Sequence, residues 1–212
     1  MKLFDLIKTT ARVELSLAEY SQIAQRYRMT IEGAMREYLF TDNARPDKYR
    51  NRMKVAVVEA FWPAFEQGLK DGGGTPPPET DDQDWLNARV EGELANVTAL
   101  FNTLKVLKKD PETGYGEYEY AIAQHTAGYL RTLDGIYSAG KVRGAANRML
   151  TFGGDEGAES CTTCQKYKGK RHKATWWTAR GLVPYQGNPN FECGCWQCQH
   201  YLYDDNGNVY SI

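Results

Sequence analysis

The sequence predicts a mainly α-helical protein, with a body of about four long helices and a small C-terminal module that combines helix and strand. Two features predict this fold. Through the first part of the chain, apolar side chains recur at every third or fourth position, which is the spacing of one helix face. Beyond residue 152 this pattern ends, and a segment rich in cysteine, glycine, tryptophan and basic residues follows. The change of composition indicates a second, differently built region.

The first predicted helix opens at Ser16. Ser16 and Glu19 have the spacing of a capping box, in which each side chain satisfies a backbone N–H of the first helical turn. The helix is expected to end in the segment 41–46, because Pro46 disfavours helix in the residue before it. Its buried face is formed by apolar residues three or four positions apart, namely Tyr20, Ile23, Tyr27, Ile31, Met35 and Tyr38.

A second helix is predicted from about Asp47 to Leu69. Its apolar face should consist of Tyr49, Met53, Val57, Phe61 and Phe65.

Pro63 lies inside the second pattern and is expected to kink the helix or end it early. The stretch 72–79 follows, with three glycines and three prolines, and neither residue type sustains a helix. We expect this stretch to be a linker that lets the first two helices move relative to the rest.

The third predicted helix opens at Thr80, which with Gln83 forms another capping box. Its stripe of apolar residues favours packing against neighbouring helices over an oligomeric coiled coil, since it covers less than three heptads. The stripe consists of Leu86, Val90, Leu94, Val97, Phe101 and Leu104.

A turn at 110–114 separates the third helix from a fourth, predicted over residues 118–150. Gly135, Gly140 and Gly144 interrupt its pattern, and each costs about 1 kcal/mol of helix stability, so they should mark close helix approach or a bend. The breaks divide the chain into four segments: an N-terminal helical region (1–71), the linker (72–79), a helical hairpin (80–152) and the C-terminal module (153–212).

The overall composition excludes several classes of protein. A formal net charge of −1 does not suit a polycation that coats nucleic acid. The N-terminal segment lacks the apolar run of a signal peptide, and no stretch has the roughly 18 apolar residues of a membrane span. The five cysteines are an odd number confined to one segment, unlike a secreted disulfide scaffold. We expect a soluble protein made in a reducing cytoplasm.

The cysteines form two short-spaced clusters. Cys161 and Cys164 make one pair, and after 28 intervening residues a second cluster contains Cys193, Cys195, Cys198 and His200. Zn²⁺ prefers four tetrahedral ligands, and a tight turn places both sulfurs of a short-spaced pair on one side. The sequence therefore predicts a zinc-ribbon-like module with a zinc ion held by four protein ligands. A closed site of this kind leaves no position for an activated water, which indicates a structural role for the metal.

The spacing does not decide the second half of this site. Cys198 can pair with Cys193 or with Cys195, and His200 can replace one of them. His172, on the loop between the clusters, is expected to be a solvated residue.

That loop is basic and aromatic, with no acidic residue from Gln165 to Gly181. Such a stretch can contact phosphates and stack on bases, or it can be a solvated loop whose tryptophans cover the metal site. The second interpretation is favoured, and the first predicts a zinc-ribbon protein that binds nucleic acid. The residues involved are Lys166, Lys168, Lys170, Arg171, Lys173, Trp176 and Trp177, with Arg180 at the end of the loop.

Signatures of catalysis are scarce. The three histidines are scattered, and no phosphate-binding loop, nucleophile elbow or His-Glu-x-x-His motif is present. A metal-dependent nuclease would need a histidine pair with an acid or asparagine around an open metal position, and His172 alone is placed to begin one. We therefore expect a protein that is not an enzyme and has no small-molecule substrate.

Residues 115–205 resemble the C-terminal region of tailed-phage minor head proteins, the head morphogenesis family related to the Mu-type minor head protein. The resemblance begins in the runs 130–140 and 144–150, passes through the first cysteine pair and the run 177–182, and ends at 193–200.

In the second cluster, Cys193, Trp196, Cys198 and His200 occupy positions of the family motif, whereas Cys195 replaces a glycine. The resemblance therefore implies the ligand set Cys161, Cys164, Cys193 and Cys198, with Cys195 and His200 as alternates.

The resemblance also implies a role. It implies a virion protein in the capsid interior or at the portal vertex, present in the host cytoplasm during assembly and acting in head morphogenesis. Its partners would be the portal protein, the major capsid protein or both, and packaged DNA, with no membrane involved. The long amphipathic helices are expected to dock on these subunits.

Overall fold

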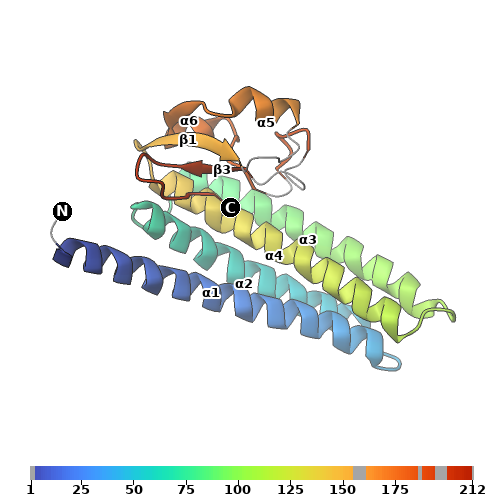
Figure 1. Cartoon of the computed structure of the whole chain (residues 1–212). Coiled ribbons are helices and arrows are strands. Elements are labelled where there is room, and N and C mark those ends of the chain that lie inside the picture. Colours follow the sequence, from blue (N-terminus) through green and yellow to red (C-terminus); the bar gives the residue numbers. More distant parts are fainter. Residues whose placement is uncertain (1–2, 155–160, 186–187, 194–199, 212) are drawn as a thin grey trace. The chain divides into compact units, whose positions relative to one another are not determined.

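The computed structural model describes residues 3–154, 161–185, 188–193 and 200–211, with side chains from Glu19 onward. The predicted fold class is confirmed, because the chain is mainly helical and has a small C-terminal region that contains strands. The four long helices are α1 (Leu3–Phe40), α2 (Pro46–Gly72), α3 (Thr80–Lys109) and α4 (Tyr115–Gly144) (Figure 1). None of the described helices has both the length and the apolar character that a membrane span requires.

The chain forms two compact units. The helical unit comprises Ser21–Pro63 and Glu79–Leu130, and the cysteine unit comprises Met1–Tyr20, Ala64–Pro78 and Arg131–Ile212. Three of the long helices contribute residues to both units, whereas α3 lies wholly in the helical unit. The unit boundaries therefore fall inside helices, and they do not coincide with the segments predicted from composition.

The core of the helical unit is built from the predicted apolar faces. Ile31 and Met35 of α1, Val57 of α2 and Leu104 of α3 are fully buried. The rings of Tyr38 and Phe101 lie 5.3 Å apart, which joins α1 to α3. The spacing of apolar residues thus identified the buried side of each helix, as expected when burial of one face stabilises a helix.

The starts of two helices differ from their predictions. Helix α1 already includes Leu3, so Ser16 and Glu19 lie within the helix and do not cap it. Helix α3 has Glu79 at its N-cap, with no side-chain hydrogen bond, and Thr80 is its first helical residue. Both capping boxes were therefore wrong: the first lies inside a longer helix, and the second begins one residue after the N-cap.

Pro63 neither ends nor divides α2, which continues to Gly72. Pro63 is exposed, so the carbonyl that loses its helical partner can accept a hydrogen bond from water. Phe61 and Phe65 on either side are fully buried and hold the helix to the core.

Helix α4 was predicted to reach residue 150 but ends at Gly144. Ala146, with a φ of 42°, turns the chain, and Met149–Gly154 forms strand β1. Strand β1 is the centre of a three-stranded antiparallel sheet, between β2 (Arg171–Lys173) and β3 (His200–Tyr203). The module therefore includes part of the predicted hairpin segment, and the boundary predicted at residue 153 falls inside β1.

Helices α5 (Thr162–Tyr167) and α6 (Ala174–Ala179) complete the module. The buried core that they form with the sheet also includes Val142 and Ala145 from the end of α4 and the residue that follows it. The core consists of Val142, Ala145, Leu150, Phe152, Cys164, Ala174, Trp177, Leu182, Val183, Phe191, Leu202 and Tyr210. The module therefore has an apolar core of its own, and the side chain of Cys164 belongs to it.

Within the cysteine unit, α2 and α4 approach closely through glycines on both helices. A Cβ atom added at Gly140 would lie 2.2 Å from the carbonyl oxygen of Phe65, and one at Gly144 would lie 2.2 Å from that of Leu69. On α2, Gly68 and Gly72 meet the backbone of α4 in the same way. Of the two roles predicted for the glycines of α4, close helix approach is the one that the structure shows at Gly140 and Gly144.

The first residues of the predicted linker are an ordered helix C-cap. Gly73 has a φ of 98°, and the N–H groups of Gly73 and Gly74 donate to the carbonyls of Lys70 and Leu69. This is the Schellman arrangement, which requires a left-handed residue that glycine adopts without strain. A Cβ at Gly74 would lie 2.9 Å from the Cα of Gly144, so this stretch packs against the end of α4 instead of forming a free hinge.

Candidate metal centre

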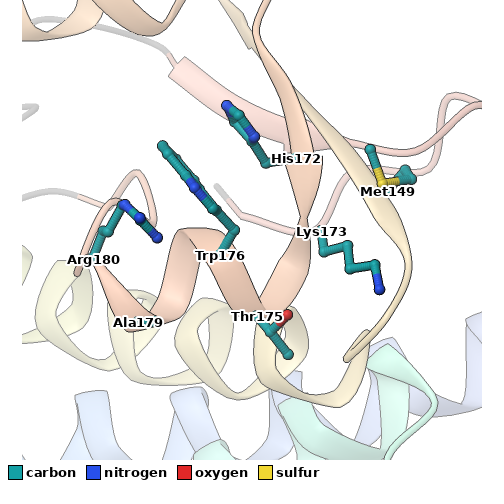
Figure 2. A pocket seen from close by; sticks show the side chains of 7 residues that line it. All are labelled: Met149, His172, Lys173, Thr175, Trp176, Ala179 and Arg180. Carbon is teal, nitrogen blue, oxygen red and sulfur yellow. The ribbon is translucent and has the colours of Figure 1, made fainter.

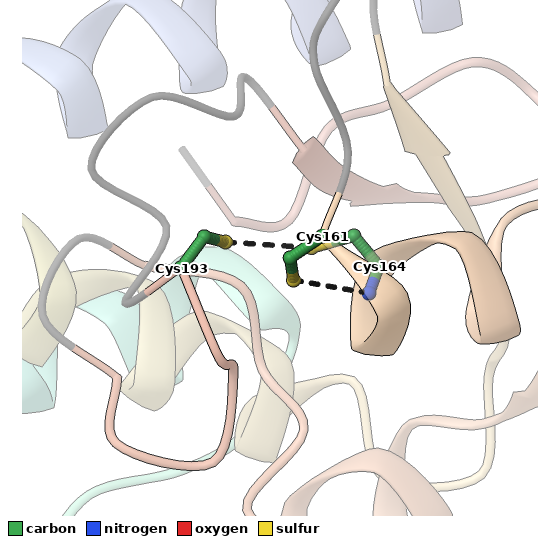
Figure 3. A group of neighbouring side chains, drawn as sticks. All are labelled: Cys161, Cys164 and Cys193. Carbon is green, nitrogen blue, oxygen red and sulfur yellow. Dashed lines mark hydrogen bonds between the residues drawn. The ribbon is translucent and has the colours of Figure 1, made fainter.

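Cys161 and Cys164 form a compact turn at the start of α5. Cys161 is the N-cap residue of this helix, and its sulfur accepts a hydrogen bond from the backbone N–H of Cys164 at 3.5 Å. The helix begins there because the extended backbone of Cys161 places its side chain over the free N–H groups of the first turn. The short spacing therefore brings both sulfurs to the same side, as predicted (Figure 3).

Cys193 joins this pair from a loop far along the chain. Its Sγ lies 3.9 Å from the Sγ of Cys164, and the sulfurs of all three residues lie within 4.8 Å of one another. A disulfide needs about 2.05 Å between sulfurs, so no disulfide joins these three cysteines. Among the described residues, this is the one group of three or more potential ligands from His, Cys, Asp or Glu.

The surroundings of Cys161 favour its thiolate. Burial raises the pKa of this thiol. Hydrogen bonds from the backbone N–H groups of Cys164 and Cys193, and contacts with their thiols, lower the pKa by more than burial raises it, to about 7. The thiolate is the form that binds metal. A cysteine with this pKa is therefore readily deprotonated at neutral pH.

The loop that carries Cys193 is held by a buried asparagine that sequence reasoning missed. Asn188 is 1% exposed, and its side-chain N–H groups donate to the carbonyls of Gly181 and Val183 at 2.9 and 2.7 Å. Its Oδ1 accepts from the backbone N–H of Asn190. The Asn-Pro dipeptide at 188–189 is a turn signal, but a turn signal alone does not show that the asparagine is buried.

Two of the predicted candidates, Cys195 and Cys198, lie outside the described residues, so the choice between them stays a prediction. His200 begins β3 and is buried, with Nδ1 3.1 Å from the carbonyl oxygen of Gly153. Its ring lies 5.2 Å from that of Phe152. The group of ligand atoms that the structure brings together does not include His200.

The residues of the basic loop divide into buried and exposed sets. Trp177 is fully buried, and its indole N–H donates to the carbonyl of Leu150 at 3.1 Å, so it cannot contact a nucleic acid. This tryptophan belongs to the same core as Cys164, in agreement with the favoured interpretation. The charged side chains are exposed, namely Lys166, Lys168, Lys170, Arg171, Lys173 and Arg180.

His172 is not the solvated loop residue that was predicted. It lies in β2, opposite Leu150, and is half-buried. Its ring stacks on that of Trp176, with centroids 3.8 Å apart and an interplanar angle of 13°. The described residues do not place it in a group of metal ligands, so they give no support to a nuclease centre built on it.

Comparison of the chain with protein-family models, with curated proteins and with solved structures finds no match.

Proposed function

We propose that Cys161, Cys164 and Cys193 hold one structural zinc ion, with Cys198 as the fourth ligand. The observation that carries this proposal is the distance of 3.9 Å between the sulfurs of Cys164 and Cys193. In a tetrahedral site with Zn–S bonds of about 2.3 Å, two sulfurs are about 3.8 Å apart. Cys164 and Cys193 thus have the separation that a single ion requires, and the sulfur of Cys161 lies within 4.8 Å of both.

The ligand chemistry favours zinc and a structural role. Thiolates select soft or borderline metals, and four protein ligands close a tetrahedral zinc site to water. The ion would join the start of α5 to the loop around Cys193, two segments that are 29 residues apart. Because Cys164 also belongs to the apolar core, metal binding and packing would stabilise the same arrangement.

Cobalt substitution tests this centre. Metal-free protein titrated with Co²⁺ is expected to develop the strong visible absorption of a tetrahedral thiolate site, with saturation at about one ion per chain. Cys193→Ser and Cys198→Ser should each weaken and shift that absorption, whereas Cys195→Ser and His200→Gln should leave it unchanged. A wild-type spectrum in Cys193→Ser would contradict the proposed centre, and a changed spectrum in Cys195→Ser alone would transfer the fourth ligand to Cys195.

The wider role that we propose is a non-enzymatic structural component of a tailed-phage head, acting at or near the portal. Its support is the resemblance of residues 115–205 to minor head proteins, which extends from α4 to both cysteine clusters. The long helices would supply the docking surface. On α2, Val55 and Val58 are 54% and 45% exposed and lie on neighbouring turns, so they offer apolar contacts to a portal or capsid subunit.

Binding to purified portal protein and major capsid protein of the same phage tests this role. The double variant Val55→Ser, Val58→Ser is expected to weaken binding at least about tenfold, since each valine would lose on the order of 1 kcal/mol of apolar burial. Glu59→Ser, an exposed change on the same helix, is the matched control and should bind as wild type does. No binding of the wild-type chain to either protein, together with its absence from heads and assembly intermediates, would contradict the role.

A further inference from the structure

A continuous stretch of the cysteine unit is exposed, cationic and free of acidic residues. From Cys161 to Gly181 the sequence contains no Asp or Glu, and its six lysines and arginines are all exposed. This stretch runs through α5, β2 and α6. Arg171 has a partner in Asp205, which is itself exposed, so part of the charge is compensated at that point.

Arg180 lies over an aromatic ring of the same module. Its guanidinium carbon lies 4.2 Å from the centre of the ring of Trp176, and the ring of His172 stacks on the same indole. Figure 2 shows Trp176 between His172 and Arg180. A planar guanidinium held over an indole loses rotamer freedom before any ligand arrives, and its N–H groups can still donate to a phosphate.

A shallow hollow lies beside this stack. Lys173 and Arg180 contribute positive charge to the lining of this hollow (Figure 2). Met149, Thr175 and Ala179 contribute small or apolar side chains to the same lining. In the part of the chain that the structure describes, no carboxylate lines the hollow. A sugar-phosphate backbone has the matching chemistry, because it presents an anionic phosphate next to an apolar deoxyribose face.

The two tryptophans do not offer a platform for bases. Trp177 is fully buried, and Trp176 is occupied by His172 and Arg180. Sequence-tolerant binding of single strands depends on aromatic faces that bases can stack on. This geometry therefore separates the two parts of the nucleic-acid hypothesis: contact with phosphates is supported, and stacking of bases is not.

We propose that the face formed by Arg180, Lys173 and the neighbouring lysines binds the phosphate backbone of double-stranded DNA without reading its sequence. This goes beyond the structural zinc centre and the docking helices. It also stands independently of them, because the residues that carry it are neither metal ligands nor part of the long helices.

Fluorescence anisotropy with the full-length, metal-loaded chain and a labelled duplex of about 20 base pairs tests the proposal, at salt concentrations from about 50 to 200 mM. Arg180→Gln is expected to weaken binding about fivefold at about 100 mM salt and to lower the slope of log K against log salt by about 0.9, the value for one lost phosphate contact. Arg180→Lys should keep the slope but weaken binding about threefold, since lysine keeps the positive charge and lacks the planar guanidinium that lies over Trp176.

Lys105→Gln is the matched control, because it removes one exposed positive charge from α3. It is expected to bind DNA as the wild type does. The metal content of each variant is measured alongside DNA binding. A variant that keeps its metal and loses DNA affinity tests the DNA proposal alone, because its metal centre is intact.

Any of several results would overturn the proposal. They are absence of binding at about 50 mM salt, an equal loss of affinity in Lys105→Gln, wild-type affinity in Arg180→Lys, and competition by polyglutamate as effective as competition by unlabelled duplex. The last result would identify an acidic protein as the partner. Tighter binding of single-stranded DNA that Trp176→Leu abolishes would also overturn it, since bases would then stack on the indole.

Discussion

Replacing Gly140 with alanine is expected to lower the free energy of unfolding by about 3 kcal/mol, a large effect for the addition of one methyl group. The new Cβ would lie 2.2 Å from the carbonyl oxygen of Phe65 and 3.2 Å from the backbone nitrogen of Leu69. Both atoms belong to the backbone of α2, so no side chain can rotate to relieve the contact. The two helices would have to separate, and that loss exceeds the gain of about 1 kcal/mol that alanine brings to a helix.

Gly128→Ala is the matched control on the same helix. A Cβ at Gly128 meets no atom of the described residues within 4 Å, so this variant is expected to be as stable as the wild type or more stable by up to about 1 kcal/mol. Urea unfolding followed by circular dichroism measures both. Equal stability of Gly140→Ala and Gly128→Ala would show that α2 and α4 are not in close contact at Gly140.

The sequence was informative about helix faces and much less so about helix ends. Ile31, Val57 and Leu104 are buried as the spacing predicted, because a repeated pattern reports the side of a helix that packs. The ends depend on individual residues whose effect changes with their surroundings. Pro63 is tolerated in α2 because it is exposed. The strand at Met149 was not predicted because the residues that pair with it come more than twenty positions later in the sequence.

The same distinction applies to the site. The turn of Cys161 and Cys164 is local, so its spacing was sufficient to predict that the two sulfurs lie on one side. The approach of Cys193 depends on the loop that Asn188 holds in place, which no spacing rule describes. Adjacent tryptophans posed a similar difficulty, because Trp176 and Trp177 differ in burial only once α6 has packed on the sheet.

Cys164→Ser is expected to have the second large effect, the loss of the bound metal. A serine hydroxyl is not a thiolate, and zinc bound in small cysteine sites contributes on the order of 10–16 kcal/mol of apparent binding free energy at neutral pH. Cys164 is also fully buried, so the variant would place a polar hydroxyl in an apolar core. We expect the cysteine unit to melt at a lower temperature while the helical unit, which has its own core, keeps its helical signal.

Thr163→Ser is the matched control for this substitution, because it changes the neighbouring residue in the same turn of α5 and leaves all three thiols in place. It should retain both the metal and the thermal stability of the wild type. Loss of metal in Thr163→Ser as well would assign the effect to a disturbed helix and not to a lost ligand.

Elemental analysis of the full-length chain, purified under reducing conditions, tests the metal centre most directly. The expected result is about one zinc ion per wild-type chain and close to none per Cys164→Ser chain. A well-folded wild-type protein that contains no zinc, and takes up none when zinc is supplied, would contradict the centre proposed for Cys161, Cys164 and Cys193.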